Sequence, residues 1–357
     1  MAELPGLDLD VLSRWLDAER PGLRSGPLDG EVLAGGKSNL TYRVTDGTRT
    51  WALRRPPLAH VLPTAHDMVR EYRVISALAD TVVPVADPVA LCTDVEVLGA
   101  PFYLMSYVDG IVLDRPGEIG RLDRQRARSV CEQVMDTLVT LHAIEPGAVG
   151  LADFGRPDGF LARQVRRWHQ QWQASRTEDR PALARVVDEL TARMPEPSPA
   201  GIVHGDYRLT NVMFRPDFGA IAAVVDWEMA TLGDPLTDVG LLFVYQQLSA
   251  ESDFVMPRMD PAAGFLTAHE MVTRYAAASP RDTSRLEWYV GFGYFKLAVV
   301  SEGIHARYLQ GMTVGAGFDH FGPAVPRLLD AALVALAGLE HLDHVAPIDD
   351  RPHAQGS

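Results

Sequence analysis

The residues best suited to chemistry lie between positions 201 and 228, in GIVHGDYRLTNVMFRPDFGAIAAVVDWE. Asp206 stands in a short His-Gly-Asp run, Asn211 follows it five residues later, and Asp226 ends an apolar segment. Carboxylate and amide oxygens are hard ligands of the kind that Mg²⁺ prefers, and Mg²⁺ in proteins commonly takes substrate phosphates as further ligands. The residue types therefore indicate metal-assisted chemistry on a phosphate.

A hairpin is expected to bring these groups together. Residues 212–214 and 221–225 are apolar and flank a turn rich in Pro, Asp and Gly, which predicts an antiparallel pair of strands. If the turn centres just after Phe218, Asn211 pairs with Asp226 at the open end of the hairpin. The alternative is that these polar residues only cap turns.

The pattern H-G-D-x4-N over residues 204–211, followed by a hydrophobic strand that ends in Asp226, resembles the catalytic core of aminoglycoside phosphotransferases and choline kinases. These are relatives of the protein kinases, which carry H-R-D-x4-N and D-F-G in the same roles. The resemblance implies ATP and Mg²⁺ as cofactors. Asp206 would accept the proton of an acceptor hydroxyl, and Asn211 and Asp226 would hold Mg²⁺ on the ATP phosphates.

The same resemblance implies an α+β, protein-kinase-like bilobal fold. We expect a small β-rich nucleotide-binding lobe over residues 1–106, a larger helical catalytic and acceptor-binding lobe over 107–345, and a loose tail over 346–357. Apolar spacing predicts a helix at 8–18 and another at 64–80. It predicts further helices at 123–143, 157–176, 181–194, 234–249, 263–277, 282–309 and 323–340.

A glycine-containing turn between two expected strands is the candidate phosphate loop of the N-terminal lobe. It consists of Gly36, Lys37, Ser38 and Asn39, where small residues would let backbone N–H groups approach phosphates. An ordinary hairpin turn is an equally good interpretation of this segment alone.

The strand that follows departs from the kinase pattern, because Arg54 stands where kinases carry a lysine. Glu71 lies beside the apolar stripe of the next helix, where an unpaired carboxylate would be costly. Arg54 is its best candidate partner. An arginine fork binds carboxylates and phosphates but does not simply replace a lysine.

The strand-like segment 101–108 would link the lobes, and by the resemblance Ser106 and Val108 would contact adenine through backbone groups.

The acceptor is suggested only by a narrower resemblance. The runs LRRPP at 53–57 and REYRVISAL at 70–78 are similar to the kinase-like domain fused to certain acyl-CoA dehydrogenases, which implies a hydroxyacyl-CoA acceptor. Helix 157–176 carries a basic and aromatic face that fits either CoA binding or a solvated surface. Two alternatives remain: an aminoglycoside or other amino-alcohol phosphotransferase, and a pseudokinase that binds nucleotide or acyl-CoA without turnover.

Composition limits the partners. Among 357 residues, 33 Lys and Arg stand against 47 Asp and Glu, giving a net charge of −14, which disfavours nonspecific binding to nucleic acid or anionic membranes. Two cysteines are too few for a disulfide framework. No apolar run reaches the length of a membrane span, and the first residues lack the order of a signal peptide. We therefore expect a cytoplasmic protein whose partners are a nucleotide and a small hydroxyl acceptor.

Overall fold

The computed structural model describes residues 4–33, 39–58, 67–251, 257–313 and 317–344. Its contacts divide the chain into two compact units. The first unit comprises Met1–Ile111, Val149–Leu151 and Val212–Ala230. The second comprises Val112–Ala148, Ala152–Asn211 and Thr231–Ser357. The division expected near residue 106 remains a prediction, as does the loose tail, which lies outside the described residues.

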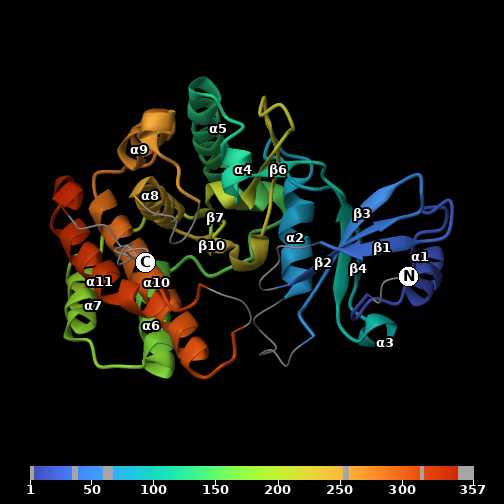
Figure 1. Cartoon of the computed structure of the whole chain (residues 1–357), viewed down its shortest axis with the longest axis horizontal. Helices are drawn as coiled ribbons and strands as arrows, with labels where there is room; N and C mark the ends of the chain where they lie inside the picture. The colour runs from blue at the N-terminus through green and yellow to red at the C-terminus, as the bar shows by residue number, and fades with distance from the viewer. Residues whose placement is uncertain (1–3, 34–38, 59–66, 252–256, 314–316, 345–357) are drawn as a thin grey trace, which may run out of the picture. The chain divides into compact units, whose positions relative to one another are not determined.

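A five-stranded antiparallel sheet forms the body of the first unit, in the order β1-β2-β3-β5-β4 (Figure 1). Its strands are β1 (Asp29–Val32), β2 (Leu40–Thr45), β3 (Thr50–Arg55), β4 (Pro88–Cys92) and β5 (Phe102–Ser106). Alternation along β2 buries Tyr42 and Val44, while the residues between them are half-buried. This period of two is what a sheet with one covered face requires.

Two helices of the first unit cover apolar residues of the sheet. Helix α1 (Leu9–Glu19) buries Leu12 and Leu16 against the sheet core, and Asp8 caps it by accepting from two amides of the first turn. Helix α2 (Met68–Leu78) is capped by Asp67 and buries one face. Both helices were expected from the spacing of their apolar residues.

The expected hairpin is present in the first unit as β8 (Val212–Phe214) and β9 (Ile221–Val224), but the predicted register is wrong by one residue. Val212 pairs with Val224, whereas the expected register pairs it with Val225. The reason is local: the register shifts between Met213 and Phe214, and Phe218 adopts a left-handed φ of 59° in the turn. Such an irregularity cannot be derived from apolar alternation.

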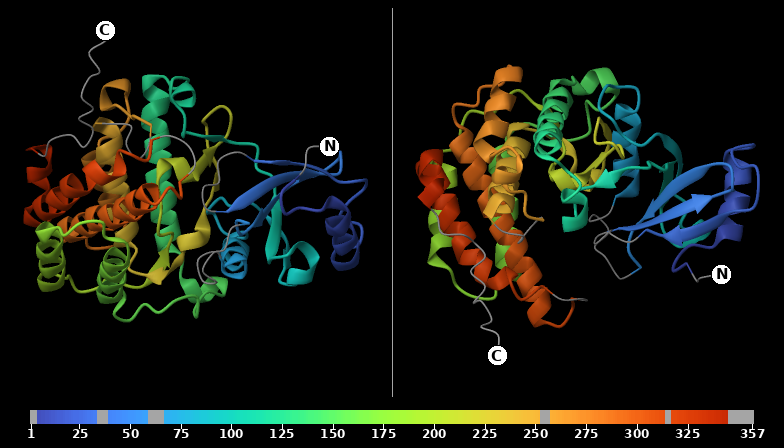
Figure 2. Two further views of the ribbon diagram at one scale, coloured as in Figure 1. Left: turned by 60° about the horizontal axis from the view of Figure 1, so that its bottom comes forward. Right: turned by 45° about the horizontal axis from the view of Figure 1, so that its top comes forward.

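The second unit is mainly helical, and all seven helices expected after residue 123 are present within a few residues of their predicted bounds. They are α5 (Arg124–Ala143), α6 (Phe160–Ser175), α7 (Pro181–Ala192), α8 (Leu236–Glu251), α9 (Ala268–Ala278), α10 (Leu286–Leu309) and α11 (Phe321–Ala337). Figure 2 shows α10 and α11 lying side by side.

Helices α8 and α10 approach each other closely because of glycine. A Cβ atom on Gly240 would lie 2.4 Å from the backbone oxygen of Tyr289, so a larger residue would force the helices apart. A short antiparallel pair, β7 (Gly201–Val203) and β10 (Thr231–Gly233), leads directly into residues 204–211 and into the start of α8. The close packing therefore fixes α8 next to α10.

Among the described residues, no helix combines the length and apolar character needed to cross a membrane.

Candidate active site

The loop of residues 204–211, in the second unit, is held by a buried carboxylate. Asp238 of α8 accepts hydrogen bonds from the backbone N–H groups of His204, at 2.7 Å, and Gly205, at 2.8 Å. Gly205 has a φ of 87°, in the region that favours glycine. Asp238 thereby anchors the loop.

A buried histidine supports Asp238 from the other side. His142 of α5 contacts Asp238 Oδ2 through Nε2 at 3.3 Å and the Tyr275 hydroxyl through Nδ1 at 2.9 Å. Burial lowers the pKa of His142, so its ring is neutral near pH 7. Burial alone would raise the pKa of Asp238, but the hydrogen bond from His142 and the loop amides hold it below its usual value. Asp238 is therefore an ionised acceptor.

Both oxygens of the Asp206 carboxylate have a donor within the second unit. The Tyr245 hydroxyl donates to Oδ1 at 2.6 Å, and Nδ2 of Asn211 donates to Oδ2 at 3.0 Å. The Asn211 amide nitrogen also donates to the Asp206 backbone oxygen at 2.8 Å, so both of these bonds fix Asn211 to Asp206. The Asp206 side chain is 21% exposed, so it is fixed but still accessible.

Two cations lie close to Asp206: Arg208 belongs to the same loop, and Lys296 belongs to α10. Nε of Arg208 is 3.4 Å from Asp206 Oδ2, and its guanidinium lies over the Tyr245 ring at 5.1 Å. The Lys296 ammonium donates to the backbone oxygen of Gly205 and lies 5.3 Å from the centre of the Trp168 ring. Burial lowers the pKa of Lys296, while Asp206 and Asp238 oppose that shift.

Sequence reasoning missed both Tyr245 and Lys296. Lys296 had a signal: it is the one charged residue in the apolar run WYVGFGYFKLAVV, at 288–300. A lone cation at that position needs a polar partner once the helix is buried. Tyr245 gave no signal, since an aromatic residue in an apolar helix indicates packing.

The first unit contains a second charged cluster, around Arg54. Its Nε lies 3.0 Å from Oε1 and 3.1 Å from Oε2 of Glu71, so the expected pair is present. Its Nη2 donates to Oδ1 of Asp226 at 2.7 Å. Arg54 therefore bridges Glu71, on helix α2, and Asp226, just after β9. The sequence predicted Glu71 as the partner of Arg54 and Asp226 as a metal ligand.

Negative charge exceeds positive charge in this cluster. Glu71 is 2% exposed, and burial, together with Asp226 and Glu228, raises its pKa to about 7 against the opposing effect of Arg54. Burial would lower the pKa of Arg54, but Glu71 and the other acids raise it, so the guanidinium stays charged. A divalent cation would relieve this excess of negative charge, so the residues present fit Mg²⁺.

The described residues contain no group of three or more His, Cys, Asp and Glu side chains able to hold a metal. A magnesium site here would therefore use few protein ligands and depend on phosphate and water oxygens for the remainder, as is usual for Mg²⁺.

Asn39 is the described member of the candidate phosphate loop; Gly36, Lys37 and Ser38 lie outside the described residues. Asn39 is 1% exposed and donates through Nδ2 to Glu228 at 3.2 Å. Its Oδ1 is buried and accepts no hydrogen bond within the described part of the chain.

The segment expected to contact adenine begins at the end of β5. The backbone N–H of Ser106 donates to Asp87 at 2.8 Å, and its hydroxyl accepts from the Asp87 amide at 2.8 Å. The N–H of Tyr107 donates to Thr50 at 3.2 Å. An adenine contact by this segment would therefore use carbonyl groups or the amide of Val108, which lies just beyond the strand.

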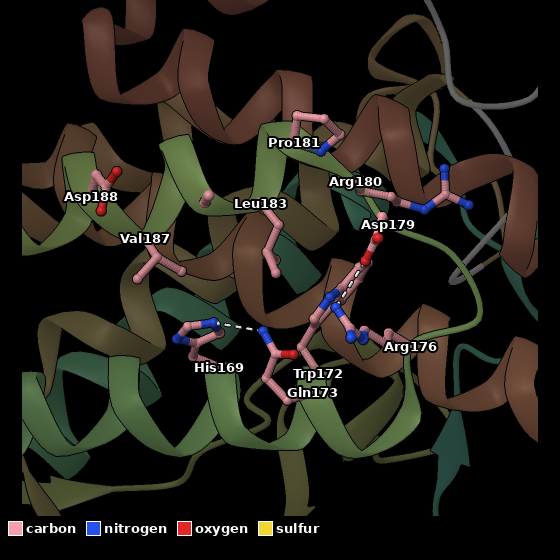
Figure 3. A pocket seen from close by; sticks show the side chains of 11 residues that line it. His169, Trp172, Gln173, Arg176, Asp179, Arg180, Pro181, Leu183, Val187 and Asp188 are labelled. Atoms are coloured by element: carbon pink, nitrogen blue, oxygen red, sulfur yellow. Dashed lines mark hydrogen bonds and ion pairs between the residues drawn. The ribbon is translucent and has the colours of Figure 1, made fainter.

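The basic and aromatic face expected on helix 157–176 is divided by the fold. Trp168 and Trp172 of α6 are buried, whereas Arg166 and Arg167 are exposed. A pocket of about 330 Å³ lies between α6 and α7 (Figure 3), where His169 bonds to Gln173. Residues 204–211 do not line it, so this pocket is separate from the loop that carries Asp206.

A β-sheet unit and a mainly helical unit, with an anchored Asp206 loop and a bridged Arg54, are typical of the kinase-like fold. Comparison with known proteins agrees: the chain belongs to the phosphotransferase enzyme family, whose model matches residues 29–280.

The similar proteins of known sequence include mouse acyl-CoA dehydrogenase family member 10, 31% identical over 90% of this chain and 30% of that protein. Chicken acyl-CoA dehydrogenase family member 11 is 30% identical over 91% of this chain and 43% of its own length. The chain thus spans less than half the length of these relatives. Homoserine kinase of Caulobacter is 28% identical over 44% of this chain and 47% of that protein.

Solved structures give the same fold. A protein from Ralstonia eutropha JMP134 assigned to the aminoglycoside phosphotransferases has a TM-score of 0.77 and 31% identity, over 95% of this chain and 99% of that one. A mutant of aminoglycoside phosphotransferase APH(4)-Ia, in a ternary complex with AMP-PNP and hygromycin B, has a TM-score of 0.61 and 18% identity. The match covers 92% of this chain and 99% of that one. The expected protein-kinase-like α+β fold is confirmed.

Proposed function

We propose that this protein transfers the γ-phosphate of ATP to the hydroxyl group of a small acceptor, with Mg²⁺ as the metal. The observation that carries the proposal is the Asp206 carboxylate, which is held by two donors and remains partly exposed. Such a group can orient an acceptor hydroxyl and take its proton.

In the proposed reaction, a bond forms between the acceptor oxygen and the γ-phosphorus as the bond to the β-phosphate oxygen breaks. The bonding electron pair leaves with ADP, and the acceptor proton moves to Asp206. Asn211 holds Asp206 through its amide nitrogen and would offer its oxygen, with Asp226, to Mg²⁺. The metal, when bound, neutralises charge on the phosphates.

The remaining nucleotide contacts are proposed for the first unit. Arg54 would meet the phosphates while Glu71 fixes its direction, and the backbone N–H of Asn39 would approach the phosphate oxygens. Gly36, Lys37 and Ser38 would surround the phosphates. Ser106 and Val108 would contact adenine through a carbonyl and an amide, respectively. The complex of APH(4)-Ia with AMP-PNP supports nucleotide binding by this fold.

For the acceptor, we propose a hydroxyacyl-CoA or a similarly anionic alcohol. Arg208 and Lys296 lie against the Asp206 loop, and Arg167 is near enough to oppose the charge on Lys296. Clustered cations attract phosphate and repel ammonium groups. This disfavours a polycationic aminoglycoside or another amino-alcohol, and the similarity to acyl-CoA dehydrogenase family members 10 and 11 supports the anionic choice.

A second candidate function is a pseudokinase that binds nucleotide or acyl-CoA without turnover. The observation that favours it is the ion pair between Arg54 and Asp226, because the arginine occupies an oxygen of the acid that would bind the metal. Turnover would require Asp226 to share that oxygen or to use the other one.

The test is ADP release from Mg·ATP over a panel of hydroxyl acceptors: hydroxyacyl-CoA thioesters, aminoglycosides, choline and homoserine. The Asp206→Asn variant is the negative control and gives the background rate of ADP release. Acceptor-dependent ADP release that this variant lacks would support the kinase. ATP binding without release for any acceptor would support the pseudokinase.

A further inference from the structure

Helix α8 contacts the Asp206 loop at two points. Asp238 holds the backbone at His204 and Gly205, and seven residues later Tyr245 reaches the Asp206 carboxylate itself. Seven residues are two helical turns, so both side chains leave the same face of α8. One rigid element therefore controls both the path of the loop and the direction of its acid.

We infer that Tyr245 is a positioning residue that holds the Asp206 carboxylate in the direction required for phosphoryl transfer. The inference rests on the function proposed above. The Tyr245 hydroxyl lies 2.6 Å from Oδ1, the length of a hydrogen bond between a hydroxyl group and an ionised carboxylate. Asn211 holds the other oxygen. With both oxygens bound, the carboxylate cannot rotate without losing a charge-assisted bond.

The tyrosine is itself held in place. Tyr245 is 7% exposed, and the Arg208 guanidinium lies 5.1 Å from its ring centre on the side where Nε also approaches Asp206. Each carboxylate oxygen has two lone pairs, so Oδ1 can accept from Tyr245 and from an acceptor hydroxyl at once. Tyr245 thus orients the acid without occupying the position of the reacting group.

The experiment compares Tyr245→Phe with Tyr289→Phe. Tyr289 is a matched control: it is a buried tyrosine whose hydroxyl donates to another carboxylate, Asp234, at 2.8 Å and outside the loop. We expect Tyr245→Phe to lower kcat roughly 10- to 100-fold, in line with loss of a hydrogen bond to a charged group, with KM for Mg·ATP nearly unchanged. Tyr289→Phe should lower Tm and keep kcat.

A double variant shows whether Tyr245 acts through Asp206. In the Asp206→Asn background, Tyr245→Phe should cause no further loss of activity, because the group it positions no longer accepts a proton. A further loss as large as in the wild-type background, or a kcat of the single variant equal to that of wild type, would overturn the inference.

A crystal structure of Tyr245→Phe separates this inference from the proposed function. We expect the Asp206 side chain to occupy a second rotamer in the variant and a single one in the wild type. One unchanged rotamer in both would overturn the inference even in an active enzyme. If the wild type transfers phosphate to no acceptor, the proposed function fails, whereas the rotamer comparison still decides the role of Tyr245.

Discussion

The two charged clusters of this molecule have opposite electrostatics. Around Arg54, one cation is shared between Glu71 and Asp226, and negative charge is in excess. Around Asp206, one acid is met by a hydroxyl, an amide and two cationic side chains. The first arrangement would favour a divalent cation, and the second would favour a neutral hydroxyl or an anionic group.

The Arg54 and Asp206 clusters also differ in how they affect the stability of the folded protein. A buried ion pair such as Arg54 with Glu71 contributes little net stability, yet removing one partner is costly because the other stays buried and charged. Asp206 is partly exposed, so its loss leaves no comparable penalty. Variants of the first cluster should therefore affect folding and binding together, and variants of the second should affect the chemical step.

The largest effect is expected at Asp206. Asp206→Asn keeps the shape of the side chain and removes proton acceptance, which typically contributes about 10²–10⁴-fold to the rate. Steady-state kinetics should show the fall in kcat, while calorimetry should show unchanged Mg·ATP affinity. Turnover close to that of wild type would remove Asp206 from the assigned role.

Arg54→Ala should lose most of the activity and destabilise the first unit. It leaves Glu71 buried without its partner, at a cost on the order of 3–5 kcal/mol, which denaturant unfolding measures. Arg54→Lys should retain substantial activity. The double change Arg54→Met with Glu71→Leu should restore much of the stability but no catalysis.

The neighbouring Arg55 provides the control for Arg54. It points to the opposite face of β3, where it donates to the backbone oxygen of Leu98 at 2.9 Å. Arg55→Ala should destabilise the fold and preserve nucleotide affinity. If Arg54→Ala instead binds Mg·ATP and melts like wild type, the cluster has no role in nucleotide binding.

A smaller effect is expected on metal binding. Asp226→Asn keeps an oxygen for Arg54 and removes the charge, so Mg·ATP affinity should fall by at least the roughly 10–100-fold that even supporting residues of a metal site cost. Asn211→Ala should weaken binding less, because an amide neutralises no charge. The control is Asp217→Asn, in the turn of the same hairpin, for which calorimetry should give an unchanged Mg·ATP affinity. Equal affinity in all three variants would contradict the metal site.

The smallest effect concerns pH. Glu71 has a pKa raised from 4.5 to about 7 by burial and by Asp226 and Glu228; Arg54 opposes the shift, and Tyr103 also hydrogen-bonds to Glu71. The folded state therefore binds this proton more tightly than the unfolded chain. The stabilisation that comes from protonated Glu71 is complete below about pH 4.5 and is lost as the pH rises through about 7.

Glu71→Gln removes this titration. The Tm of the variant relative to wild type should rise steadily between about pH 5 and about pH 8, as scanning calorimetry can measure. Glu189→Gln is the control, since Glu189 is 43% exposed and pairs with Arg193 at the surface. A constant difference in Tm for Glu71→Gln would show that Glu71 does not titrate in this range.

Several features of this protein follow from the sequence by itself. The spacing of apolar residues predicted the helices after residue 123, because a helical period is a local property that packing rarely overrides in long segments. The motif at 204–211 indicated the phosphotransferase class. The position of Glu71 on a buried helix face predicted its pair with Arg54, because a carboxylate there needs a cation.

Other features were decided only by the tertiary structure. The hairpin register depended on the left-handed Phe218 and on a shift at Met213, which strand alternation does not encode. The contacts of Tyr245 and Lys296 with the Asp206 loop depend on where α8 and α10 pack, and Gly240 sets how closely those helices approach. The lone charge of Lys296 in an apolar run indicates that it needs a polar partner, but only the packing of the helices determines that this partner is the Asp206 loop.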